Sequence, residues 1–183
     1  SSGNSSARAP LSIYPERNIP TMKRYLALLM SVVLVVLDQV LKMLAYDYLR
    51  PIDTYPLIED VLHLTYLENR GAAFGIMQGQ TWLLIWGTGL ILLILILAVM
   101  IGKIPGTLPN FIVCIIIGGG VGNLIDRVYR GYVIDYIQVR FVDFAIFNFA
   151  DICVVTGVIL LVLYIFFHEM LSRKGKGKEQ EIG

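Results

Sequence analysis

Four long apolar stretches alternate with polar segments along the chain. The second of these stretches has no charged residue over its 21 positions. About 20 apolar residues are the length that an α-helix needs to cross the hydrocarbon core of a bilayer. The pattern therefore predicts four membrane-spanning helices, over Tyr25–Tyr46, Trp82–Gly102, Asn110–Ile125 and Phe149–Phe167.

Two of the polar segments have the character of strands rather than of helices. In the segment Asp47–Thr81, apolar and polar residues alternate loosely from Val61 onward, which favours a short strand. The segment Arg130–Phe147 is β-like between Tyr132 and Val142. We therefore expect an all-α membrane protein, with four transmembrane helices and a small extracytoplasmic β-rich element.

Composition agrees with this class and excludes several functions. Of the 183 residues, 56% are hydrophobic and only 16% are charged, which is typical of a membrane protein. The net charge of +1 gives no footprint for nucleic acid. Cys114 and Cys153 lie in apolar stretches without a CxxC pair, and His63 and His168 match no metal-ligand spacing. We expect no metal and no cofactor.

The ends of the chain differ from its apolar body. Residues 1–21 are rich in Ser and Pro, and Met22 followed by two basic residues looks like a natural start. We therefore interpret 1–21 as an added or disordered leader, 22–170 as the four-span membrane domain and 171–183 as a basic cytoplasmic tail. The basic residues Lys23, Arg24 and Lys103 fall on the same side as this tail, so both termini are expected in the cytoplasm.

Polar residues gather at the opposite, extracytoplasmic surface. Two i, i+4 pairs share helix faces there, Asp38 with Lys42 and Asn123 with Arg127. Ionisable groups at a hydrocarbon boundary are costly and indicate a functional site. The gathered set is Asp38, Lys42, Asn69, Asn123, Arg127, Asp135, Asn148 and Asp151.

Four aspartates could supply a catalytic pair in this region. Two carboxylates in one site do not both ionise cheaply, so one stays protonated while the other acts as a base on water. Asp126 is followed directly by Arg127, with which we expect a structural ion pair, and Asp143 lies in the β-like segment. Asp135 and Asp151 are our candidates, although spacing alone leaves the choice of pair open.

Five motifs resemble those of the lipoprotein signal peptidase family, also called signal peptidase II. The resemblance covers residues 22 to about 170. The family consists of aspartic proteases of the bacterial inner membrane, which remove the signal peptide of prolipoproteins before a cysteine that carries a diacylglyceryl group. The motifs are DQVLK at 38–42, ENRGAAFG at 68–75, GNLIDR at 122–127, YVIDYI at 132–137 and FNFAD at 147–151.

The resemblance implies a role for each gathered residue. Asp135 and Asp151 would be the catalytic dyad, with Asp38, Lys42 and Asp126 in support. The resemblance further implies lipid-modified prolipoproteins and membrane lipids as partners, a monomer, and occupation of the dyad site by inhibitors such as globomycin. The site would face the extracytoplasmic side of the inner membrane. The residues implied to bind substrate are Asn69, Gly71, Asn123, Arg127 and Asn148.

A small membrane transporter or channel is the competing interpretation, because intramembrane Asp, Lys and Arg residues also mark ion pathways. Such a protein would spread its charges through the depth of the bundle or contain internal repeats. In this chain the charges cluster at one surface and no repeat is evident.

Overall fold

The computed structural model describes residues 21–71 and 80–181, with side chains as far as residue 172. Its helices are α1 (Thr21–Leu44), α2 (Thr81–Met100), α3 (Thr107–Arg130) and α4 (Phe149–Glu181), and a π-helical turn, η1 (Ala45–Leu49), continues α1. The strands β1 (Thr54–Ile58), β2 (Leu62–Asn69) and β3 (Val133–Val139) form one antiparallel sheet in that order.

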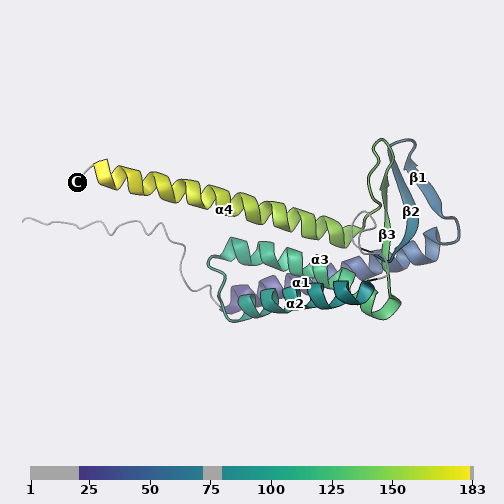
Figure 1. Ribbon diagram of the computed structural model, residues 1–183, viewed down its shortest axis with the longest axis horizontal. Coiled ribbons are helices and arrows are strands. Elements are labelled where there is room, and N and C mark those ends of the chain that lie inside the picture. Colours follow the sequence, from purple (N-terminus) through teal and green to yellow (C-terminus); the bar gives the residue numbers. More distant parts are fainter. Residues whose placement is uncertain (1–20, 72–79, 182–183) are drawn as a thin grey trace, which may run out of the picture.

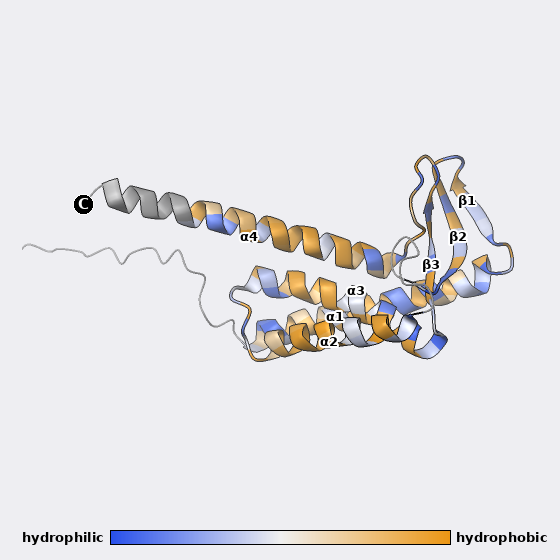
Figure 2. Ribbon diagram, viewed as in Figure 1, coloured by the Kyte–Doolittle hydropathy of each residue, from blue (hydrophilic) through white to orange (hydrophobic). Residues whose placement is uncertain are grey.

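The helices run along one direction, and the sheet crosses one end of the bundle (Figure 1). The beginning of α1, the turn between α2 and α3 and the end of α4 all lie at the opposite end. Four helices among the described residues are long and apolar enough to cross a membrane. Hydrophobic residues dominate these helices (Figure 2), and many of their apolar side chains are exposed, among them Leu90 and Val33. The protein is therefore a multi-pass membrane protein of the predicted fold class.

Helix α3 is the centre of the bundle and packs against each of the other three helices. Its glycines allow this close approach. A Cβ on Gly118 would lie 2.9 Å from Leu34 Cβ of α1, and one on Gly119 would meet the carbonyl oxygen of Ala150 in α4. Small residues at such positions bring helix backbones together in membranes, where no hydrophobic effect drives association.

The observed bounds extend the predicted spans. Helix α3 continues past Ile125 to Arg130 and ends at Gly131, whose left-handed conformation (φ 78°) terminates the helix. Helix α4 continues past Phe167 to Glu181, so most of the segment 171–183, which we interpret as a tail, is helical. The predicted leader falls almost wholly on residues 1–20, which lie outside the described residues.

The sheet contains one strand that the sequence pattern did not predict. Every residue of β1 is exposed, so this strand has no alternation of buried and exposed positions, and it contains Pro56. Proline is tolerated here because β1 is an edge strand. The predicted strands correspond to β2 and β3, whose register pairs Leu67 with Asp135 and Asn69 with Val133.

Candidate active site

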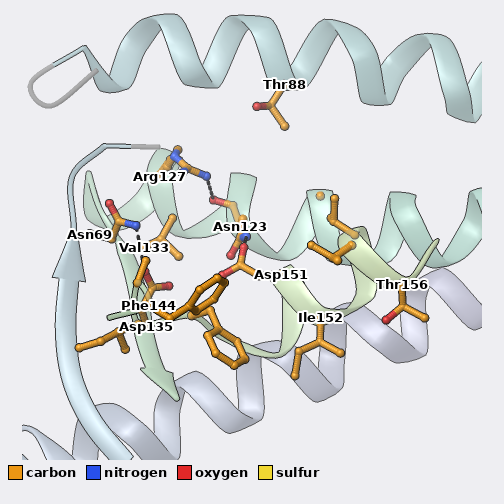
Figure 3. A pocket seen from close by; sticks show the side chains of 16 residues that line it. Asn69, Thr88, Asn123, Arg127, Val133, Asp135, Phe144, Asp151, Ile152 and Thr156 are labelled. Atoms are coloured by element: carbon orange, nitrogen blue, oxygen red, sulfur yellow. Dashed lines mark hydrogen bonds between the residues drawn. The ribbon is translucent and has the colours of Figure 1, made fainter. Parts of the chain in front are cut away.

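The two candidate carboxylates come from different elements and line the same pocket (Figure 3). Asp135 lies within β3, and Asp151 lies in the first turn of α4. Helix α3 contributes Asn123 and Arg127, while β2 ends at Asn69. The structure therefore brings residues from four of the sequence motifs to one place.

Both carboxylate oxygens of Asp135 accept hydrogen bonds from side-chain amides. Asn69 Nδ2 donates to Oδ2 at 2.9 Å, and Asn148 Nδ2 donates to Oδ1 at 2.6 Å. Asp135 is 1% exposed. Burial, reinforced by the charge of Asp151, raises the pKa of Asp135 to about 7, against the opposing effect of the two amides. A proton on this carboxyl is therefore available near neutral pH.

Asp151 is held by the start of its own helix and by α3. Asn123 Nδ2 donates to Asp151 Oδ1 at 2.7 Å. The backbone N–H of Asn148 donates to Oδ2 at 3.1 Å, and the N–H of Asp151 donates to Asn148 Oδ1 at 3.0 Å. This reciprocal pair is a capping box, with Asn148 just before the helix. Asn148 thus contacts both candidate carboxylates and fixes their relative position.

A buried ionic network of Asp38, Lys42 and Asp126 contacts the Asn123 side chain. Lys42 Nζ lies 2.9 Å from Asp38 Oδ2 and 3.2 Å from Asp126 Oδ2, and the three side chains are almost fully buried. Lys42 Nζ also donates to Asn123 Oδ1 at 2.8 Å. Since Asp38 Oδ1 accepts from the N–H of Ala150 at 3.1 Å, the network ties α1, α3 and α4 together.

The predicted pairing of Asp126 with Arg127 is wrong. Asp126 Oδ1 instead lies 3.4 Å from Arg130 Nε, and Oδ2 pairs with Lys42 and accepts from the N–H of Ile134. Neighbouring residues on a helix point in different directions, whereas residues four apart share a face. Asp126 therefore supports the bundle through α1 and β3.

Arg127 points toward the rim of the site. Its Nη2 donates to the carbonyl of Gly71 at 3.0 Å, and its Nη1 donates to the carbonyl of Asn123 at 3.4 Å. The N–H of Gly71 donates to Asn69 Oδ1 at 3.0 Å. The end of β2 is thereby fastened to α3 beside the carboxylates. The next residues of this motif, 72–75, lie outside the described residues.

A cavity of about 580 Å³ opens beside the two carboxylates. Asn69, Asn123, Arg127, Asp135 and Asp151 form its polar end. The remaining wall is mainly apolar, and it comes from α2, α3, α4 and the segment before α4. The residues of that wall are Thr88, Gly120, Val133, Phe144, Ala145, Ile146, Phe147, Ile152, Val154, Val155 and Thr156.

Two features of the site differ from the sequence reasoning. Asp143, one of the four aspartates considered, is exposed in the turn after β3 and does not line the cavity. Thr88 and Thr156 do line it but were not predicted, although a hydroxyl within an otherwise apolar span was a signal available in the sequence. Among the described residues, no group of three His, Cys, Asp or Glu side chains could hold a metal ion.

Comparisons with solved structures find the same architecture in bacterial membrane enzymes. One, described as a bacterial membrane enzyme structure at 2.3 Å resolution, has a TM-score of 0.69 and 30% identity, over 76% of this chain and 87% of that chain. Another, at 1.9 Å resolution, has a TM-score of 0.68 and 31% identity, over 76% of this chain and 91% of that one.

Comparisons of sequence agree with those of structure. A lipoprotein signal peptidase of Caldanaerobacter subterraneus is 44% identical over 78% of this chain and 97% of its own length. One of Clostridioides difficile is 39% identical over 81% of this chain and 99% of its own length. Residues 30–167 match the family model for signal peptidase (SPase) II. The chain therefore belongs to the signal peptidase II family.

Proposed function

We propose that this protein is an aspartic endopeptidase that removes the signal peptide from diacylglyceryl-modified prolipoproteins, cleaving before the lipidated cysteine. The observation that carries the proposal is the pairing of Asp135 and Asp151 through Asn148 at the polar end of an otherwise apolar cavity. Membership of the family supports the same substrate class.

Asp151 is the general base and Asp135 the general acid in this proposal. The Asp151 carboxylate lies in the first turn of α4, where the helix dipole favours negative charge by roughly 0.3–1 kcal/mol. Asp135 has a pKa of about 7, so it retains a proton near neutral pH. The two environments thus favour different protonation states, as acid–base catalysis by two carboxylates requires.

The reaction begins with a water molecule between the two carboxyl groups. Asp151 removes a proton from this water as its oxygen attacks the scissile carbonyl carbon, while Asp135 donates its proton to the carbonyl oxygen. In the resulting gem-diol, Asp151 passes its proton to the leaving nitrogen as the C–N bond breaks. A hydroxyl of the gem-diol returns a proton to Asp135, which restores the starting state.

Shape and polarity suit the proposed substrate. Its signal helix and acyl chains are apolar, as is the cavity wall that α2 and α4 provide. The scissile bond would lie at the polar end, within reach of the carboxylates. The guanidinium of Arg127, a rigid fork with several donors, already binds the Gly71 carbonyl and is placed to hold a substrate carbonyl at the same rim.

The expected location is the bacterial inner membrane, with both termini in the cytoplasm and the site on the extracytoplasmic side. The enzyme acts as a monomer without metal or cofactor, and globomycin-type inhibitors occupy the cavity beside the dyad. The sheet end of the bundle, where the carboxylates lie, is the extracytoplasmic end in this arrangement (Figure 1).

The test is cleavage of a lipidated prolipoprotein peptide by the purified protein. Asp135→Asn and Asp151→Asn keep the size and polarity of the side chain but remove the titrating group, so each should reduce turnover by at least about 10³-fold while the protein remains folded. Asp143→Asn, on the exposed turn, is the matched control and should cleave at the wild-type rate. Wild-type turnover in either dyad variant, or an inactive Asp143→Asn, would contradict the assignment.

A further inference from the structure

Two arginines meet around one tyrosine at the sheet ends of α1 and α3, away from the cavity. The guanidinium carbon of Arg50 lies 4.8 Å from the ring centroid of Tyr46, and that of Arg130 lies 5.8 Å from the same centroid. Arg50 Nη1 also donates to the Tyr46 hydroxyl, and Tyr66 packs edge-on against the ring at 6.1 Å. We call Tyr46, Arg50 and Arg130 the Tyr46 cluster; its cations are held on an ordered scaffold.

The two arginines of the Tyr46 cluster differ in their ion pairs. Arg130 Nε pairs with Asp126, but Asp126 also pairs with Lys42, which in turn pairs with Asp38. Those two cations and two anions cancel. Within the described part of the chain, Arg50 forms no ion pair with a carboxylate, and its side chain is exposed. Arg50 is therefore an exposed cation of the cluster without a direct carboxylate partner among the described residues.

The depth of the cluster in the membrane identifies what could neutralise this charge. Arg50 directly follows the segment Thr21–Leu49, which is long enough to span the bilayer, and Arg130 is the last residue of another spanning segment. Tyr48 and Tyr129 flank the cluster and are 71% and 85% exposed. Exposed tyrosines at helix ends are typical of the level of the lipid headgroups. Phosphate groups of lipids lie at this depth.

We propose that the Tyr46 cluster binds the phosphodiester of an anionic phospholipid in the leaflet next to the sheet. Guanidinium groups form paired, charge-assisted hydrogen bonds with phosphate oxygens. Tyr46 orients Arg50 before the lipid arrives, so less side-chain freedom is lost on binding. The acyl chains would lie along the exposed apolar faces of α1 and α3, where Met43, Leu44 and Val128 point outward. This site is independent of the proposed peptidase activity.

The experiment measures lipid binding to the full chain in detergent by native mass spectrometry. Phosphatidylglycerol is the probe, and phosphatidylcholine with the same acyl chains and inorganic phosphate are the comparisons. We expect saturable binding of phosphatidylglycerol, weaker binding of phosphatidylcholine, and no comparable effect of inorganic phosphate on the Tm. Arg50→Gln should weaken phosphatidylglycerol binding by about tenfold, the loss expected for a charge-assisted hydrogen bond.

Arg140→Gln is the matched control, because Arg140 is an exposed arginine at the end of β3 and lies outside the cluster. It should bind phosphatidylglycerol like the wild type. Arg50→Gln leaves no protein carboxylate without its partner, so its fold should be intact, and the Tm in phosphatidylcholine checks this. Wild-type affinity in Arg50→Gln, equal loss in Arg140→Gln, or equal stabilisation by inorganic phosphate would each overturn the proposal.

Discussion

At the scale of single residues, the environment of Asp135 predicts how the protein responds to pH. Folding raises the pKa of this carboxyl from 3.8 to about 7, mainly through burial. The folded protein therefore holds a proton that the unfolded chain releases between these values. The resulting stabilisation is fully present below pH 4 and is lost as the pH rises through 7, by roughly 4 kcal/mol at most.

Asp135→Asn should accordingly raise the Tm of the detergent-solubilised protein at pH 8, because it removes a carboxylate that is costly to bury. At pH 4 the Tm should change little. Cleavage by the wild type should decline as the pH rises through about 7, since the general acid loses its proton. Equal Tm values for variant and wild type at pH 8 would show that ionising the buried Asp135 carboxyl does not destabilise the folded protein.

Lys42 orients Asn123, and this leads to a second residue-scale prediction. An ammonium group only donates, so Asn123 must turn Oδ1 toward Lys42 and Nδ2 toward Asp151, as observed. Lys42→Met, made together with Asp38→Asn to limit unpaired buried charge, should lower kcat by about tenfold or more relative to Asp38→Asn alone. In an Asn123→Ala background the same change should add little. Full additivity would mean that Lys42 acts by another route.

Residue spacing predicted one local contact of the site, between Asp38 and Lys42, but not the contacts between elements. Asp38 and Lys42, four residues apart on a helix, form the expected pair at 2.9 Å. The capping of Asp151 by Asn148 is likewise local. The bonds from Asn69 to Asp135 and from Lys42 to Asp126 depend on strand register and helix packing, which no pattern within one segment encodes. Only the resemblance to the family implied that these residues belong to one site.

At the scale of elements, the length of each apolar stretch predicted a helix, because a helix needs about 20 apolar residues to cross the bilayer. No comparable constraint acts on the sequence of strand β1. Its five residues are all exposed, and an edge strand needs only one partner. The bounds of α3 and α4 were underestimated because polar residues at the helix ends look like loop. Arg127 and Arg130 in the last turn of α3 are favourable there, beside the negative end of the helix dipole.

The glycines of α3 predict a graded response to added methyl groups. Gly119→Ala would press against the backbone carbonyl of Ala150, which is fixed within α4, and should destabilise the protein by about 1–3 kcal/mol. Gly120→Ala would meet the end of the Leu92 side chain, at 2.7 Å, which can shift more easily than a backbone carbonyl. Gly87→Ala, with no atom within 4 Å, is the control. Thermal unfolding in detergent should rank Gly119→Ala lowest; equal Tm values would refute close packing at Gly119.

At the scale of the whole molecule, function depends on which face of the membrane the sheet occupies. The buried ion pairs, the paired carboxylates and the polar end of the cavity all lie at the sheet end. A secreted substrate reaches such a site only if that end is extracytoplasmic. The spans hold α3 against its neighbours, and the sheet end of the bundle carries the candidate site.

The topology can be measured with one cysteine at each end of the molecule, in a protein with Cys114→Ala and Cys153→Ala. Thr54→Cys lies on exposed β1, and Ser172→Cys lies in the far part of α4. Basic residues favour the cytoplasm, and Lys23, Arg24 and Lys103 lie at the end opposite the sheet.

A membrane-impermeant thiol reagent added to intact cells should therefore label Thr54→Cys, and Ser172→Cys only after the membrane is opened. Gly87→Cys, within α2 and exposed to lipid, should resist the polar reagent in both conditions. Labelling of Thr54→Cys and Ser172→Cys from the same side would contradict the four-span topology. Labelling in the reverse order would place the carboxylates on the cytoplasmic side.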